Sequence, residues 1–275
     1  MELSDNVGTE LDEAQEPIQV VGRGGKVARI TLNRPDQRNP LDKHTIKKLR
    51  HVIAELEADC AVHIITVRGA GGHFSAGGDL KGYVDLYRHP DEFREFLVDF
   101  HGMLDEIESS RKIYVAVVDG YCVAGGLEVL LACDIVMAGS SAKIGDGHIR
   151  FGQLPGAGGS QRLMRKVGPT RARYLMLTGD IITATEAERI GLVSRVVADE
   201  ALDHAMAGLI KGLSGASSLG LAGMKRLANI AERNDLTSGL RAELEYVHDY
   251  ASNSVDASEG LMAFQEKRAP QFTGR

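Results

Sequence analysis

The chain is poor in cysteine, with three in 275 residues: Cys60, Cys122 and Cys133. So few cysteines, in an odd number, provide no disulfide framework, and their spacing does not match a zinc site. Each lies near or within an apolar segment. We therefore expect all three to be small buried residues in a protein of a reducing compartment.

The chain also lacks a long uninterrupted apolar run. Its longest apolar region, residues 113–139, is broken by Asp119, Glu128 and Asp134, so it is expected to be a protein core rather than a membrane span. The first sixteen residues are acidic and polar, show no secretory or transit signal and are expected to be disordered. These features predict a cytoplasmic protein that does not bind membranes.

Positive charge is not in excess, because 32 Lys and Arg residues face 38 Asp and Glu residues and the formal net charge is −6. This balance argues against a nucleic-acid-binding surface, although a local basic patch for phosphates stays open. The hydrophobic content of 43% and charged content of 25% are typical of soluble globular proteins. The length fits one large domain or a main domain with an extension.

Two glycine-rich turns stand out, FSAGGDL at 74–80 and CVAGGLE at 122–128. Neither reads Gly-x-Gly-x-x-Gly and neither is followed by Gly-Lys-Ser/Thr, so a dinucleotide site and a phosphate-binding P-loop are not supported. Each turn places small residues just after an expected strand. The two turns could aim two backbone N–H groups at one oxygen and stabilise an oxyanion or enolate. The alternative is two independent tight turns.

Hydrophobic periodicity predicts an α/β core at 17–200, followed by a helical region at 201–275. A hairpin is expected from Arg23-Gly24-Gly25, which joins two apolar runs. Asp42 is expected to cap a helix, and Thr183 with Glu186 forms a capping-box pattern. The expected strands are 18–21, 27–32, 62–67 and 115–118, and the expected helices include 46–56, 93–107, 127–132, 221–230 and 240–250.

The central stretch, 114–159, carries the polar residues most suited to chemistry. Gly125 and Gly126 open a helix whose first turn holds Glu128, beside whatever the N–H groups at that end hold. His148 can take or give a proton near neutral pH, and Asp146 could orient it if the backbone between them is extended. Alternatively, His148 lies at the rim of a pocket in which Glu128 alone exchanges protons. No third metal ligand is present, so no metal is expected.

Six ordered motifs resemble the crotonase, or enoyl-CoA hydratase/isomerase, superfamily, over nearly the whole chain after residue 16. They are ITLNRPDQRNPL (30–41), FSAGGDL (74–80), DGYCVAGGLEVLLACDI (119–135), FGQLPGAGGSQRL (151–163), LTGDIITATEAERIGLVSRVV (177–197) and EGLMAFQEKRAPQF (259–272). The resemblance implies a spiral of ββα turns and a C-terminal helical region that packs in a homotrimer, often stacked into a hexamer. It implies an acyl-CoA thioester substrate and no cofactor other than the coenzyme A of that substrate.

By motif position, the resemblance assigns the two oxyanion-hole N–H groups to Gly78 and Gly125. Hydratases of this superfamily use two glutamates, one holding water and one passing a proton. Glu128 matches the first, whereas His148 stands at the position of the second. The stretch GDGHIRFGQLPG is instead similar to a branch of C–C bond hydrolases, although that branch has Asp at the position of Ala157.

The resemblance also carries a set of expected substrate and CoA contacts. Arg38 follows a strand end that in the family passes the CoA phosphates, and the last motif can reach the CoA of a neighbouring subunit. The expected contacts are Arg38, Ala76, Asp79, Leu80, Lys81, Gly126, Phe264 and Lys267. The leading hypothesis is hydration of an unsaturated acyl-CoA by Glu128 and His148. The alternatives are hydrolysis of a β-dicarbonyl or thioester through His148, and a CoA-binding protein with little catalysis.

Overall fold

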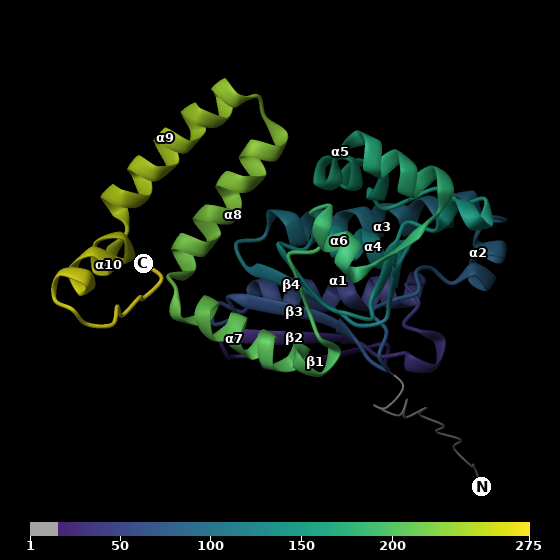
Figure 1. Ribbon diagram of the computed structural model, residues 1–275, viewed down its shortest axis with the longest axis horizontal. Coiled ribbons are helices and arrows are strands. Elements are labelled where there is room, and N and C mark those ends of the chain that lie inside the picture. The colour runs from purple at the N-terminus through teal and green to yellow at the C-terminus, as the bar shows by residue number, and fades with distance from the viewer. Residues whose placement is uncertain (1–15) are drawn as a thin grey trace, which may run out of the picture.

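The computed structural model describes residues 16–275 (Figure 1). Six strands form the main sheet, in the order β1-β2-β3-β4-β6-β9, and three form a small sheet, in the order β5-β7-β8. The strands are β1 Ile18–Val21, β2 Val27–Leu32, β3 Ile64–Gly69, β4 Ile113–Val118, β5 Tyr121–Val123, β6 Ile135–Gly139, β7 Lys143–Gly145, β8 Ile181–Thr183 and β9 Arg195–Val197. Of the residues 1–16 that are expected to be disordered, 1–15 lie outside the described part, whereas the carbonyl of Glu16 accepts from Asn33 Nδ2 at 3.2 Å.

Ten α-helices and three short 3₁₀ helices accompany these strands within residues 16–275. The α-helices are α1 Lys43–Ala58, α2 Leu80–Leu86, α3 Pro90–Ser109, α4 Gly125–Ala132, α5 Gly159–Thr178, α6 Ala184–Arg189, α7 Leu202–Gly215, α8 Ser218–Arg233, α9 Leu236–Asn253 and α10 Val255–Gln265. The 3₁₀ helices are η2 Pro35–Gln37, η3 His148–Phe151 and η4 Asp199–Ala201.

The main sheet begins with the predicted hairpin and continues as a parallel sheet. β1 and β2 pair antiparallel with Ile18 opposite Leu32, whereas β2, β3, β4, β6 and β9 run parallel. All six residues of β4 are buried, as expected for a parallel strand covered on both faces. The strand predicted at 62–67 is β3, which begins two residues later because the Val62 N–H closes a turn onto Asp59.

Repeated strand–strand–helix units connect the main sheet to the small sheet. In each of two successive units, β4-β5-α4 and β6-β7-α5, the first strand joins the main sheet and the second joins the small sheet. An isolated parallel bridge between Ser75 and Cys122 places the segment after β3 beside β5. The two glycine-rich turns are thus brought to the same place between the sheets.

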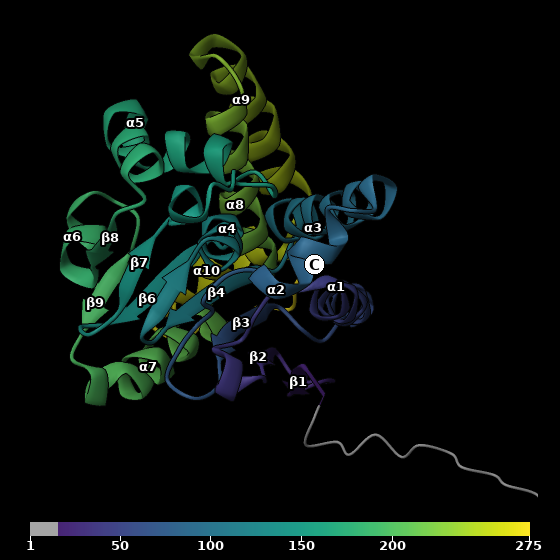
Figure 2. The same ribbon diagram turned by 90° about the vertical axis from the view of Figure 1, so that its right-hand side faces the viewer.

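Helices α1 and α3 pack side by side against the main sheet (Figure 2). The side chain of Asp42 caps α1 by accepting from the Thr45 N–H at 2.8 Å, as predicted. The apolar stripe of α1 is buried, and α3 buries Phe96 and Phe100. The helix predicted at 93–107 therefore exists but is longer, since it begins at Pro90.

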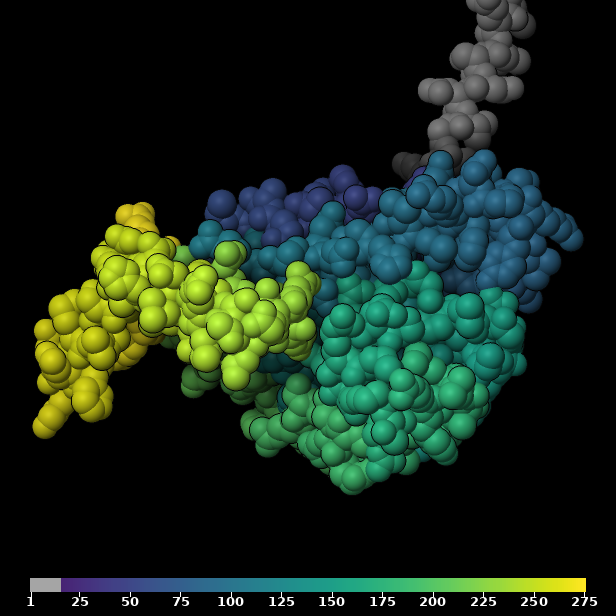
Figure 3. Space-filling model, turned by 90° about the horizontal axis from the view of Figure 1, so that it is seen from above, coloured from purple at the N-terminus to yellow at the C-terminus, as the bar shows by residue number. Residues whose placement is uncertain are grey.

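The C-terminal region divides into a part that covers the sheet and a part that projects from it. From α7, Leu202 and Met206 pack on Ile64 and Val115 of the main sheet. Helices α8, α9 and α10 form the projecting part, in which α8 still contacts α3 and β4 (Figures 1 and 3). They leave exposed a set of large apolar side chains, which includes Met224, Leu236, Leu240, Leu244, Leu261 and Phe264.

Two of the three cysteines are buried as expected, but Cys60 is exposed. It lies in the turn that follows α1, beyond the buried stripe of that helix, so the expectation for this residue was wrong. Within residues 16–275, no helix combines the length and apolarity needed to cross a membrane. The same residues contain no group of three or more His, Cys, Asp and Glu side chains placed to hold a metal.

Candidate active site

The first glycine-rich turn, 74–80, packs against the second, 122–128, at the point where β5 ends and α4 begins. The Ser75 N–H donates to Tyr121 O at 3.0 Å, and the Val123 N–H donates to Ser75 O at 3.1 Å. A Cβ added to Gly77, which has φ +95°, would lie 2.8 Å from the Ala124 Cβ and 3.5 Å from the Gly125 nitrogen. Such an approach requires glycine at position 77.

Both candidate oxyanion-hole N–H groups lack an acceptor within the described part of the chain. Among residues 16–275, neither the Gly78 N–H nor the Gly125 N–H donates to a protein acceptor. Gly125 is the first residue of α4, where no side chain caps the helix and the helix dipole is positive. Ala124, just before it, has φ 50° and ψ −119°, a strained conformation for alanine. An N–H group without an acceptor at the positive end of a helix attracts an electron-rich oxygen.

Glu128 lies in the first turn of α4 with 2% of its surface exposed. Its Oε1 accepts from the Ala157 N–H at 2.7 Å and the Gly159 N–H at 2.9 Å. Oε2 has no hydrogen-bond partner in residues 16–275 and is not among the fully enclosed polar atoms. One oxygen is thus held by the protein, and the other is free to meet water or substrate.

Burial raises the pKa of Glu128 above its ordinary value. The charge of His148 and the two backbone N–H groups oppose this effect, because each favours the carboxylate form. A raised pKa makes the carboxylate a stronger base than an exposed glutamate.

His148 begins η3 and contacts Asp146, with 3.0 Å between Nδ1 and Oδ1. Both side chains are largely buried. The sequence predicted this contact for an extended backbone between the two residues, but the backbone there is not extended. Gly147 has φ +66°, and this left-handed glycine turns the chain so that residues 146 and 148 reach the same side.

Burial lowers the pKa of His148, but the hydrogen bond and charge of Asp146, with the charge of Glu128, outweigh burial and raise it overall. His148 therefore keeps its proton to higher pH than an exposed histidine. Since Asp146 takes Nδ1, Nε2 is the ring nitrogen available to a substrate. Ala157, which departs from the hydrolase pattern, is buried and contributes its N–H to Glu128.

Several of the expected CoA contacts surround the first glycine-rich turn. The Ala76 N–H donates to the Arg38 carbonyl at 2.9 Å, and the Arg38 guanidinium lies 5.6 Å from the centre of the Tyr121 ring. Asp79 caps α2 by accepting from the Lys81 N–H at 3.1 Å. Leu80 and Lys81 are exposed, whereas Gly126 is buried against Ser75.

Phe264 and Lys267 are not brought to this site within one chain. Phe264 is 84% exposed on α10, at the end of the molecule opposite α2, and Lys267 follows that helix (Figures 1 and 3). A contact between these residues and bound CoA would therefore need a second copy of the chain.

Sequence reasoning missed Tyr83 of α2. A Cβ added to Gly78 would lie 2.3 Å from the Tyr83 hydroxyl, so the phenol packs directly on the turn. Among residues 16–275, this hydroxyl makes no hydrogen bond to a side chain. Burial raises its pKa and the charge of Glu128 adds to this effect. An aromatic residue five positions after Gly78 was the available signal, but only the direction of α2 reveals the contact.

Comparisons with known proteins agree with this arrangement. A family model described as enoyl-CoA hydratase/isomerase matches residues 22–275. A probable enoyl-CoA hydratase of Mycobacterium tuberculosis is 40% identical over 258 residues, covering 93% of this chain and 98% of the relative. The 2,3-dehydroadipyl-CoA hydratase of Escherichia coli is 33% identical over 258 residues, with the same coverage.

Among solved structures, an enoyl-CoA hydratase from Bacillus anthracis matches with a TM-score of 0.89 at 30% identity, covering 94% of this chain and 100% of that one. This match confirms the crotonase-type α/β fold. The relatives named here are hydratases, and they give no support to the hydrolase or binding-only alternatives. The chain belongs to the enoyl-CoA hydratase/isomerase family of the crotonase superfamily.

Proposed function

We propose that this enzyme adds water to the double bond of a 2-enoyl-CoA thioester. The observation that carries the proposal is that, within residues 16–275, the N–H groups of Gly78 and Gly125 have no acceptor and lie near a buried glutamate with one oxygen that accepts no hydrogen bond. His148, held by Asp146, supplies the second proton-exchanging group. The family membership and the names of the hydratase relatives support the same reaction type.

The two N–H groups would bind the thioester carbonyl oxygen. When a nucleophile adds to the β-carbon of the double bond, negative charge moves onto this oxygen and forms an enolate. N–H groups already in place, at the positive end of α4, stabilise that charge more than they stabilise the neutral carbonyl.

Glu128 and His148 would divide the proton transfers. The free Oε2 of Glu128 takes a proton from a water molecule as the oxygen of that water attacks the β-carbon. The imidazolium of His148 then gives a proton to the α-carbon of the enolate. The raised pKa of Glu128 suits a base, and the raised pKa of His148 keeps the acid protonated near neutral pH.

We propose that the acyl-CoA is the only small molecule the reaction needs besides water, with no further cofactor. Around the first turn, the CoA portion would contact Arg38, Ala76, Asp79, Leu80, Lys81 and Gly126. The exposed apolar faces of α8–α10 fit a homotrimer or hexamer, in which Phe264 and Lys267 reach the site of a neighbour. The cytoplasmic location expected from the sequence stays a prediction.

A panel of acyl-CoA substrates tests the proposal. Hydration of an enoyl-CoA removes the absorbance of the conjugated thioester and releases no thiol, and we expect this result for at least one unsaturated chain. Release of free CoA would favour thioester hydrolysis instead. Movement of the double bond without water uptake would favour isomerisation, and no turnover with tight binding would favour a binding protein.

A binding measurement distinguishes an acyl-CoA substrate from a free-acid or diketone substrate. Calorimetry with a saturated acyl-CoA and with its free acid should show tighter binding of the thioester, because adenine and phosphate contacts add to those of the acyl chain. Equal affinities would contradict an acyl-CoA site.

A further inference from the structure

The orientation of Glu128 depends on the segment 155–159, which supplies both N–H groups that hold Oε1. Its last part is fixed by helical hydrogen bonds, because the Gly158 carbonyl accepts from the Gln161 N–H at 3.0 Å and the Arg162 N–H at 2.9 Å, whereas residues 155–157 precede α5. The side chain that ties Ala157 to α3 is that of Arg162, one turn into α5.

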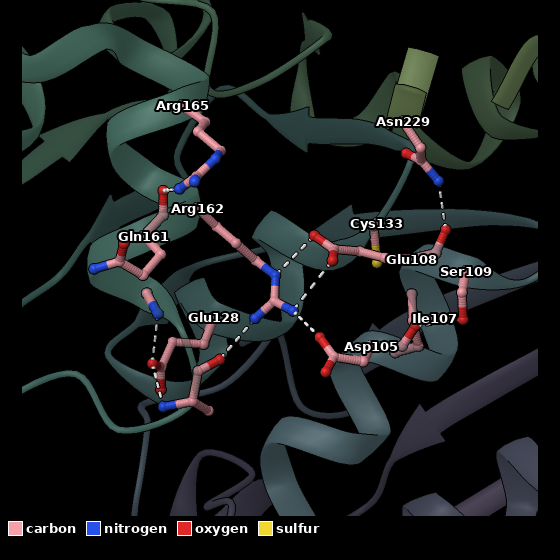
Figure 4. Close-up of polar contacts among 12 residues, drawn as sticks. Asp105, Ile107, Glu108, Ser109, Glu128, Cys133, Gln161, Arg162, Arg165 and Asn229 are labelled. Carbon is pink, nitrogen blue, oxygen red and sulfur yellow. Dashed lines mark hydrogen bonds and ion pairs between the residues drawn. The ribbon is translucent and has the colours of Figure 1, made fainter. Parts of the chain in front are cut away.

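Arg162 donates in three directions (Figure 4). Its Nη1 donates to the Ala157 carbonyl at 2.8 Å. Its Nε donates to Glu108 Oε1 at 2.7 Å, and its Nη2 to Asp105 Oδ1 at 2.8 Å. With a side chain only 12% exposed, Arg162 joins the segment to the C-terminal turns of α3.

The contact between Arg162 and Ala157 is close to the one that holds Glu128. Ala157 uses its carbonyl for Arg162 and its N–H for Glu128, so a shift of this residue moves both contacts. Gly158 permits the approach because it has no Cβ, and an added Cβ would lie 2.3 Å from Arg162 Nη1. Its φ of +92° is also a value that glycine adopts readily. A chain of direct contacts therefore runs from Asp105 and Glu108 through Arg162 and Ala157 to Glu128.

We propose that Arg162 is a positioning residue for Glu128: it holds the 155–159 segment so that the Ala157 and Gly159 N–H groups fix Oε1 and leave Oε2 aimed at the reacting water. The kinetic part of this inference rests on the proposed hydratase function. The positioning part does not, because it concerns contacts within the chain.

Hydrogen bonds from the two N–H groups favour the charged form of Glu128. If Arg162 no longer holds the segment, these bonds lengthen while burial stays, so the pKa of Glu128 rises. The free oxygen also loses its fixed direction, and a displacement of about 1 Å at a reacting group can lower turnover about 100-fold.

The test is Arg162→Gln, studied by two independent measurements. Carbon-13 NMR of the labelled Glu128 carboxyl should show a pKa higher than in the unchanged enzyme. With an enoyl-CoA substrate, kcat should fall roughly 10- to 100-fold, with a smaller change in KM because Gly78 and Gly125 are untouched. The acidic limb of the kcat/KM profile should move to higher pH, since Glu128 must be ionised to act as base.

Arg233→Gln is the matched control. Arg233 also pairs with Glu108, with 3.0 Å between Nη2 and Oε2, but it forms no hydrogen bond with segment 155–159. We expect this variant to keep the Glu128 pKa and the pH profile. Equal shifts in both variants would mean that the charge balance around Glu108 matters and that Arg162 has no positioning role.

Arg162→Lys repeats the test if Arg162→Gln does not fold. Lysine keeps the charge but lacks the planar fork that reaches Ala157, Glu108 and Asp105 together, so we expect shifts in the same direction. A folded variant with an unchanged Glu128 pKa and an unchanged acidic limb would overturn the proposal. If no enoyl-CoA is hydrated by the unchanged enzyme, the proposed function fails while the NMR result still decides the role of Arg162.

Discussion

Glu128 and His148 are expected to act on the same substrate, one as base and one as acid. Replacing Glu128 with Gln or His148 with Asn removes a proton transfer with little change of shape, and each should lower turnover roughly 10²–10⁴-fold. The double variant should lose much less than the product of the two effects, because groups that act as a unit are not additive. Steady-state kinetics on the best enoyl-CoA measures all three.

Binding of a saturated acyl-CoA is the control, and it should change little because the N–H groups of Gly78 and Gly125 remain. Near-normal turnover in His148→Asn, with an inactive Glu128→Gln, would mean that Glu128 alone exchanges protons and that His148 takes no part in the reaction.

Asp146 should set the alkaline limb of the pH profile. Its hydrogen bond and charge raise the pKa of His148, so in Asp146→Asn that pKa should fall. His148 must be protonated to act as acid, and activity should therefore be lost at lower pH than in the unchanged enzyme. The measurement is kcat/KM against pH. An unmoved alkaline limb would show that a group other than His148 gives this limb.

Tyr83 should contribute to the site through its hydroxyl, which packs on Gly78 and has no partner side chain in the described residues. Tyr83→Phe keeps the ring, and we expect kcat/KM to fall about tenfold, as for loss of one hydrogen bond. Tyr87→Phe is the control, since Tyr87 stacks on Tyr83 but its hydroxyl donates to Gln153. A larger effect in the control would contradict a substrate contact of Tyr83.

Sequence reasoning found Glu128 and His148 because each lies in a local motif. It could not find Arg162, because the proposed role of this residue depends on its hydrogen bonds to Asp105 and Glu108, which lie more than 50 residues away in the chain. It proposed the contact between Asp146 and His148 but for the wrong backbone geometry, since the conformation of Gly147 decides it. The proposed roles of all these residues stay predictions until the variants are measured.

At the scale of elements, strong local signals placed the hairpin and helices α1, α3, α8 and α9, whereas no range was predicted for α5, which has 20 residues. The hairpin strands, the Asp42 cap and the buried stripe of α1 all follow from local sequence. The strands β5, β7 and β8 have three residues each, too few to show an alternating pattern, so the small sheet had no signal of its own. Its existence depends on pairings between distant segments.

Lys225 helps to attach α8 to the core, together with Asn229 and Arg233, which both contact Glu108. The Nζ of Lys225, 4% exposed at the side-chain level, donates to the carbonyls of Ile107 and Lys112 and to Asp134 Oδ2 at 2.9 Å. Lys225→Met should lower the free energy of unfolding by about 3 kcal/mol, because a largely buried carboxylate loses its partner. Urea unfolding measures this. Lys211→Met, at an exposed position, should change it little, and equal losses would contradict the anchoring role.

At the scale of the whole molecule, the C-terminal helices leave a large apolar surface that a single copy does not cover. Leu240 and Leu244 on α9, with Leu261 and Phe264 on α10, are between 56% and 84% exposed. Solvent contact of so many large side chains is unfavourable. We therefore expect light scattering at micromolar concentration to give the mass of a trimer or hexamer, and a monomeric mass would contradict this.

The same assembly should complete the CoA site. Helix α10, which carries Phe264 and is followed by Lys267, lies at the far end of the molecule from α4, which carries Glu128 (Figure 1). We therefore expect Phe264 and Lys267 to contact CoA only from a neighbouring copy. Leu240→Asp with Leu244→Asp should lower the mass and raise the KM for an enoyl-CoA, because the neighbour's contacts are lost together with the interface. Leu177→Asp, at a 75% exposed site on α5, is the control for adding charge to an exposed leucine. A monomeric double variant with an unchanged KM would show that each chain binds CoA by itself, and that Phe264 and Lys267 have no part in it.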